Sequence, residues 1–174
     1  MKLKVELLTK DAFCAFGEVV EAAGTRGIPI NQGYAVRRNG LARVDVAHHG
    51  GDTNVCLFVA QPRPAPIKIE VMERHPDGSQ LFYPLQDRPW LVVVCGDPRQ
   101  PDSYRAFAAS GQQGVNYARN IWHHPLLVLD VDSRFMVVDR SGPGANLEEV
   151  FLDQTQPLQL EVDAAALNMS GAAR

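Results

Sequence analysis

The sequence predicts one all-β domain, an antiparallel barrel or sandwich built from many short strands. Its 174 residues match the size of a single ordinary domain. Runs rich in β-branched and aromatic residues recur through the middle of the chain, and most of the 12 prolines and 14 glycines lie between these runs. Such frequent punctuation breaks long helices, and short strands without crossover helices are expected to pair antiparallel.

A short helical turn is expected near the N-terminus. The Thr9 hydroxyl can accept from the first backbone N–H groups of a turn through Lys10–Phe16, and Gly17 can supply a left-handed stop. At the other end, Ala164–Leu167 is apolar but lies in a tail of small and polar residues. We therefore expect one domain over residues 1–174, with a tail that frays from about residue 164.

Eight strands are expected between these ends. Turn signals such as Gly50-Gly51 and Pro76-Asp77-Gly78 separate them. The predicted strands are Val44–Val46, Asn54–Ala60, Lys68–Glu73, Gln80–Tyr83, Trp90–Cys95, Tyr104–Ala108, Pro125–Val131 and Arg134–Asp139.

Charge, cysteine content and hydropathy exclude several classes of protein. The net charge is −3, from 17 Lys+Arg against 20 Asp+Glu, so no basic field exists to bind nucleic acid. Cys14, Cys56 and Cys95 form no C-x-x-C pair, which argues against a zinc knuckle, and unpaired thiols suit a reducing compartment. The longest apolar run, Trp90–Cys95, is far shorter than the ~20 residues of a membrane-spanning helix. We expect a cytoplasmic protein with no nucleic-acid or membrane partner.

The first candidate site surrounds His75. If Lys68–His75 is extended, Glu73 and His75 point to one face and Arg74 points to the other, because side chains two apart share a face. A carboxylate and an imidazole that converge inside a barrel can bind a divalent metal or exchange a proton. The alternative is a structural Glu–His hydrogen bond at a strand end. The exposed-loop pair His48-His49 is expected to have no role.

The second candidate site surrounds His123. Asn120 suits a left-handed turn position, and Pro125 suits a strand start or edge. His123 and His124 then face opposite sides of their strand, so only one of them can line a given pocket. A purely structural histidine is the alternative for each of them.

These two neighbourhoods resemble the two motifs of the cupin superfamily. Glu73-Arg74-His75 followed by Gln80 is similar to a degenerate first motif, H-x-H followed by Glu. Ala118–His123 is similar to the second motif, P-x-G-x-x-H, with Ala for Pro and Asn for Gly. The resemblance implies a cupin-like antiparallel β-barrel, or jelly roll, with Glu73, His75, Gln80 and His123 as metal-ligand candidates. A neutral glutamine is a weaker ligand than a carboxylate.

From Met1 to about Phe151 the chain also resembles the bacterial ureidoglycolate lyase family. The resemblance rests on seven ordered blocks: Phe13–Val20, Ile30–Gly33, Ala60–Pro62, Glu73–Pro76, Gly114–Tyr117, Trp122–Leu126 and Asp139-Arg140. It implies a homodimeric cupin-like enzyme, linked to a divalent metal such as nickel, zinc or manganese. That enzyme cleaves (S)-ureidoglycolate to glyoxylate and urea in the degradation of allantoin and purines. The loop Gln86–Pro89 lacks a lysine that some members carry.

The chemistry of that reaction matches the candidate residues. A base must take the hydroxyl proton of the substrate while the C–N bond breaks, and an acid must protonate the departing urea nitrogen. Histidine suits both tasks near neutral pH. His75 and His123, with Glu73, are the catalytic candidates, and either histidine can be the base. Arg119 ranks first among the arginines for holding the carboxylate, ahead of Arg74 and Arg140.

Two further side chains, Asn31 and Tyr117, are candidates for hydrogen bonds to the ureido group, and Asp139-Arg140 for an ion pair behind the site. Two other functions remain open at this point. One is a cupin enzyme of another reaction class, and the other is a non-catalytic cupin that binds a small carboxylate.

Overall fold

A computed structural model describes residues 1–155, 157–163 and 167, which form two large sheets and one small hairpin. The nine-stranded sheet runs β15 (Glu148–Phe151), β7 (Val71–Arg74), β12 (Trp122–His123), β9 (Trp90–Cys95), β10 (Tyr104–Ala109), β1 (Lys2–Leu7), β16 (Leu158–Glu161) and β6 (Lys68–Ile69), with β13 (Leu127–Val128) beside β9. The five-stranded sheet runs β2 (Gly17–Val20), β11 (Gly114–Tyr117), β8 (Gln80–Pro84), β14 (Ser133–Ser141) and β5 (Asp52–Ala60). The hairpin consists of β3 (Ile28–Ile30) and β4 (Ala35–Arg37).

The helical elements whose bounds the structure describes are all short turns. They are α1 (Lys10–Phe13) and the 3₁₀ turns η1 (Asn31–Gly33), η2 (His48–Gly50) and η3 (Pro101–Ser103). The predicted cap is confirmed, because the Thr9 hydroxyl oxygen accepts from the Ala12 N–H at 3.1 Å. The helix ends at Phe13, three residues earlier than expected. No described helix is long and apolar enough to span a bilayer.

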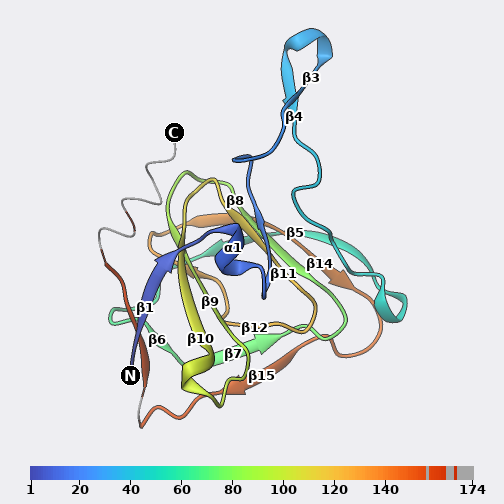
Figure 1. The fold of residues 1–174 in the computed structure, drawn as a ribbon. Coiled ribbons are helices and arrows are strands. Elements are labelled where there is room, and N and C mark those ends of the chain that lie inside the picture. Colours follow the sequence, from blue (N-terminus) through green and yellow to red (C-terminus); the bar gives the residue numbers. More distant parts are fainter. Residues whose placement is uncertain (156, 164–166, 168–174) are drawn as a thin grey trace.

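The two sheets curl around a common core (Figure 1). Val92 and Val94 of β9 point into this core and pack with Phe82 of β8 and Phe135 of β14 from the five-stranded sheet. The alternate residues of β9 lie in a second cluster on the far side of the strand, with Ile69, Met72 and Leu160 among its members. Because both faces of β9 are buried, its sequence is apolar throughout rather than alternating.

The predicted all-β, barrel-like architecture is confirmed, with β1 as an exception to antiparallel pairing. β1 pairs in parallel with β10 and with β16. These strands lie far from β1 in the sequence, so no tight turn fixes their direction. The predicted extent of one domain stays a prediction, and the expectation for the tail from residue 164 falls almost entirely outside the described residues.

Several strand predictions were wrong in detail. Val44–Val46 is not a strand, although Asp45 and Ser79 exchange backbone and side-chain hydrogen bonds. Only Leu127–Val128 of the predicted Pro125–Val131 pairs with another strand, since Pro125 has no N–H to donate. Gly17 has a φ of 147° and opens β2. A Cβ at this position would lie 2.0 Å from the Asn116 carbonyl oxygen, so the close approach of β2 to β11 requires glycine.

Candidate functional site

Glu73, His75 and His123 meet between the two sheets. One potential ligand atom from each lies within 4.8 Å of those of the other two. The ring centroids of His75 and His123 are 5.3 Å apart. Glu73 and His123 are register partners on β7 and β12, which lie side by side in the nine-stranded sheet (Figure 1). Gln80, on β8 of the five-stranded sheet, contacts His123. The structure therefore brings the two predicted neighbourhoods together.

Backbone geometry explains this convergence. Glu73 and His75 point inward, whereas Arg74 points outward, stacks over Trp122 with its guanidinium carbon 4.5 Å from the ring centroid, and donates to Glu148 at 2.7 Å. Asn120 adopts the predicted left-handed conformation, with φ at 70°. Its N–H donates to the His75 carbonyl at 2.9 Å, which ties the segment of one histidine to that of the other.

Backbone carbonyls fix the proton on one ring nitrogen of each histidine. His75 Nδ1 lies 2.7 Å from the Asn146 carbonyl oxygen, and His123 Nδ1 lies 2.9 Å from the Ile121 carbonyl oxygen. A carbonyl only accepts, so both Nδ1 atoms carry hydrogen and both Nε2 atoms face the cluster. His75 Nε2 is buried and has no hydrogen-bond partner among the described residues. A buried nitrogen lone pair of this kind is available to a proton, a substrate or a cation.

His123 Nε2 faces two oxygen atoms. The atom lies 3.2 Å from Gln80 Oε1 and 3.4 Å from Glu73 Oε1, and both of these oxygens are acceptors. A proton on Nε2, or a cation shared among the three atoms, satisfies this arrangement. Burial raises the pKa of Glu73, but the hydrogen bond from His123 and the charges of His123, His75 and His124 outweigh it and leave that pKa below its usual value. Glu73 is therefore ionised at neutral pH.

Tyr117 forms the inner wall of the cluster. Its ring stacks on His123 with centroids 4.1 Å apart and planes 10° from parallel. Burial raises the pKa of its phenol far above the usual value, so the hydroxyl stays neutral. Tyr117 thus holds the His123 ring in place, while its predicted contact with the ureido group stays a prediction.

His124 directly follows β12 and is not part of the cluster, and its predicted place on the opposite face of a strand stays a prediction. It is buried, and its Nδ1 lies 2.7 Å from the Pro125 carbonyl oxygen. Burial lowers its pKa to about 4, so the ring is neutral at pH 7. His124 therefore shares the burial of His123 without its position in the cluster.

The other predicted binding residues lie outside the cluster. Arg119 is exposed and lines a surface groove with Glu18, Arg43 and Asn116. Asn31 lies at the tip of the β3–β4 hairpin, which stands away from the body of the molecule (Figure 1). The roles of Arg119 and Asn31 in substrate binding stay predictions.

The predicted Asp139–Arg140 ion pair is wrong, because adjacent strand residues face opposite sides. Asp139 accepts from Asn54 Nδ2 at 2.8 Å. The buried Arg140 instead donates to the carbonyl oxygens of His48, His49 and Pro143.

A second group of potential metal ligands lies on the surface. His48 Nδ1 and His49 Nδ1 lie 2.9 and 3.0 Å from the same oxygen of Asp77. The hydrogen bond from His48 is the main cause of a lowered pKa at Asp77. Both histidines are exposed, as predicted, and the Asp77 carboxylate already contacts Nδ1 of each ring.

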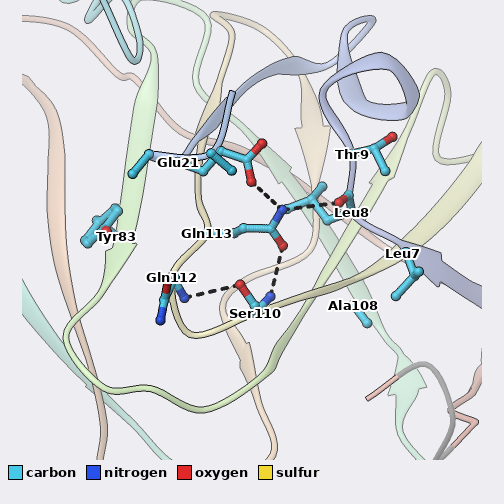
Figure 2. Close-up of a pocket in the computed structure, with 11 residues that line it drawn as sticks. Leu7, Leu8, Thr9, Glu21, Tyr83, Ala108, Ser110, Gln112 and Gln113 are labelled. Atoms are coloured by element: carbon cyan, nitrogen blue, oxygen red, sulfur yellow. Dashed lines mark hydrogen bonds between the residues drawn. The ribbon is translucent and has the colours of Figure 1, made fainter. Parts of the chain in front are cut away.

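The pocket in Figure 2 is a poor candidate for the chemistry. It has a volume of about 360 Å³ and lies between Leu7–Thr9, Glu21–Ala23 and Ser110–Gln113. The Gln113 amide donates to Glu21 and to the Leu8 carbonyl, and its oxygen accepts from the Ser110 N–H. These polar groups are thus satisfied within the protein. The pocket is also near the Trp90 end of β9, whereas His123 pairs with Val94, about 13 Å along the strand.

Sequence reasoning missed the groups that orient the two histidines. The carbonyls of Asn146 and Ile121 fix the tautomers, and a backbone carbonyl leaves no signal in the residue types. Asn146 also accepts the Asp77 N–H through its side chain at 2.7 Å, so one residue holds both ends of the His75–Asp77 turn.

The donor set fits a divalent cation. Two imidazole nitrogens and a carboxylate oxygen suit nickel, zinc or manganese. The other ring nitrogen of each histidine, Nδ1, is held by a backbone carbonyl, as is usual for metal-bound histidines. The unpartnered His75 Nε2 supports this fit. Gln80 can supply a fourth, weaker oxygen ligand.

Comparisons with known proteins agree on one family. The sequence profile of the family described as Ureidoglycolate lyase matches residues 1–161. Ureidoglycolate lyase 1 of Rhizobium meliloti is 51% identical over 153 residues, covering 87% of this chain and 90% of that protein. Ureidoglycolate lyase of Pseudomonas syringae is 44% identical over 161 residues, covering 91% of this chain and 95% of that protein. A solved structure of Bacillus subtilis oxalate decarboxylase is 13% identical with a TM-score of 0.37, over 57% of this chain and 24% of that one, and does not bear on the site.

Proposed function

Because the chain belongs to the ureidoglycolate lyase family, we propose that its Glu73, His75 and His123 cluster cleaves ureidoglycolate to glyoxylate and urea. The observation that carries this assignment is the pair of Nε2 atoms. One is an unpartnered buried nitrogen and the other faces an ionised carboxylate. Together they offer a proton acceptor and a proton donor close enough to act on one small molecule.

The two histidines differ in ways that suggest their roles. His75, with hydrogen on Nδ1 and a free Nε2, suits the base that takes the proton of the substrate hydroxyl. His123 suits the acid, because its Nε2 faces the Glu73 carboxylate and the Gln80 amide oxygen, which can both accept from an N–H there. As the hydroxyl loses its proton, its carbon becomes the carbonyl of glyoxylate and the C–N bond breaks. The bonding pair stays on the ureido nitrogen, which takes the proton from His123 and leaves as urea, without consuming water.

We also propose that the same donor set, Glu73, His75 and His123 with Gln80, binds a divalent cation. Such an ion, when bound, would polarise an oxygen of the substrate. Each Nε2 can hold a proton or a cation but not both at once. Activity with and without chelation therefore decides which state turns over.

The remaining parts of the proposal rest on the family resemblance. We propose a cytoplasmic homodimer of single-domain chains that acts in allantoin degradation and prefers the (S)-enantiomer. The cysteines Cys14, Cys56 and Cys95, which are free, support a reducing compartment.

The direct test is to incubate the purified full chain with racemic ureidoglycolate and measure both products over time. Equal amounts of glyoxylate and urea, above the rate without protein, are expected. Conversion that stops at half of the racemate would identify a stereospecific enzyme. No product above background, with or without added nickel, zinc or manganese, would leave a cupin of another reaction class or a non-catalytic binding protein.

A further inference from the structure

A basic, apolar arm projects from the body of the molecule. The arm is residues Gly24–Gly40, which contain β3, η1 and β4, and Figure 1 shows it standing clear of both large sheets. In the described part of the chain, hydrogen bonds of arm residues stay within the arm or reach Ala22 at its base. Among the described residues, the arm is thus hydrogen-bonded to the body of its own chain only at its base.

The arm exposes apolar side chains on both of its faces. Ile28 and Ile30 project from one face of the hairpin, and Val36, which pairs with Pro29, projects from the other. Tyr34 is 92% exposed and Val36 is 61% exposed. A two-stranded hairpin alone is at most marginally stable in water, and clustered exposed apolar side chains mark interaction surfaces.

The five-stranded sheet carries a matching uncovered surface, the β5 face. It consists of Val55, Leu57 and Val59 of β5 with Met136 of β14, which pairs with Leu57. Val55 is 63% exposed and Leu57 is 57% exposed. β5 is also the last strand of its sheet among the described residues, so its outer backbone edge is unpaired. An edge strand of nine residues whose last six, Val55–Ala60, are apolar is an aggregation hazard unless something covers it.

The distribution of charge along the chain indicates which partner covers the β5 face. The arm contains Arg26, Arg37 and Arg38 and no acidic residue, so its charge is +3, whereas the rest of the chain carries −6, from 14 Lys+Arg against 20 Asp+Glu. Acidic residues lie near both ends of β5: Asp52 opens the strand with its side chain on the opposite face, and Asp132, bonded to Gln61, lies beside the far end. Arg134 pairs with Val59 and is a basic residue on the β5 face itself. A basic arm on an otherwise acidic body is complementary to a second copy of the same chain.

We propose that the arm of each chain docks on the β5 face of a second copy, so that a two-fold dimer is closed by exchanged arms. In a two-fold interface every contact occurs twice, so both arms and both β5 faces are covered at once. The proposal deepens the homodimer proposed above and assigns its contacts. The catalytic cluster takes no part in it.

The test measures the molar mass of the full chain by light scattering after size exclusion at about 10 µM, a concentration at which a specific interface of standard size stays assembled. The arm variant is Val36→Asp, and the face variant is Leu57→Asp. Phe151→Asp is the matched control, because Phe151 is an exposed aromatic residue on β15, outside both surfaces. Wild type and the control should be dimers, and each of the other two variants should be a monomer.

Mixing the two variants gives the decisive result. In a mixed dimer the two damaged surfaces face each other, and the intact arm of one chain meets the intact β5 face of the other. The equimolar mixture should therefore form dimers, which also shows that both variants are folded. The surface variant Arg37→Glu with Arg38→Glu should weaken self-association by about tenfold.

A monomeric wild type would overturn the homodimer and the arm exchange together. A dimeric wild type would overturn the arm exchange alone if Val36→Asp and Leu57→Asp remain dimers, or if their mixture stays monomeric. Product formation from ureidoglycolate is measured separately, so failure of the proposed reaction does not affect this result.

Discussion

Two adjacent buried histidines allow a controlled test of the candidate site. His123 and His124 are 1% and 2% exposed, and each holds Nδ1 against a backbone carbonyl oxygen, at 2.9 and 2.7 Å. In asparagine the side-chain amide can take the place of Nδ1–H, while the position of Nε2 is lost. His123→Asn and His124→Asn therefore make the same chemical change at two adjacent buried residues, of which only His123 belongs to the cluster.

The expected effects differ widely. His123→Asn removes the nitrogen that faces Glu73 and Gln80, and loss of one acid or base typically costs 10²–10⁴-fold, equivalent to about 3–5 kcal/mol of transition-state stabilisation. His124→Asn removes a buried nitrogen with no hydrogen-bond partner, so we expect kcat/KM within about threefold of wild type. The assay is glyoxylate release, with circular dichroism to confirm folding. Equal losses in both variants, or full activity of folded His123→Asn, would refute the assignment.

Four other outcomes are expected. Burial holds the pKa of His124 at about 4, below the 6.5 of an unfolded chain, so the unfolded state takes up this proton first. The free energy of unfolding should then fall by up to about 3 kcal/mol as pH drops from about 6.5 to about 4. The midpoint of urea unfolding should change less with pH in His124→Asn than in wild type. The same pH dependence of the midpoint in both proteins would contradict this. Nickel, zinc or manganese at a hundredfold excess over its dissociation constant should stabilise the chain by about 2.7 kcal/mol, and should fail to do so in His75→Ala, as thermal shifts and metal analysis can show. Tyr117→Leu should lower kcat, because the His123 ring loses the aromatic ring that stacks on it. The lost stacking should also cost about 0.5–1.5 kcal/mol of stability beyond the effect of the smaller buried area. An unchanged kcat would show that Tyr117 does not position His123. Arg119→Lys should raise KM more than it lowers kcat if the guanidinium holds the substrate carboxylate, and unchanged constants would remove that role.

The sequence was most informative where one short-range rule determined the outcome. Parity along an extended segment places Glu73 and His75 on one face, and a left-handed Asn120 leads into the strand of His123. The predicted strand Trp90–Cys95 is correct at both ends, because its apolar run is buried on both faces.

Long-range pairing accounts for the main omissions. β1 and β16 come from opposite ends of the chain and pair with each other. β1 also pairs with β10, and β16 also pairs with β6, so both strands depend on long-range partners. Arg119 was expected to face the same side as His123, which requires an extended chain between the two residues. The turn at Asn120 interrupts that chain, and Arg119 lies on the surface instead. The carbonyls that fix the histidine tautomers depend on backbone position rather than residue type.

The proposed mechanism requires that His75 and His123 act on one small anion held between the two sheets. A crystal structure of the protein with glyoxylate bound would show where this anion lies. We expect glyoxylate within about 3 Å of His75 Nε2 or His123 Nε2, or on a cation held by both. Glyoxylate bound only in the pocket of Figure 2, or in the surface groove beside Arg119, would contradict the claim.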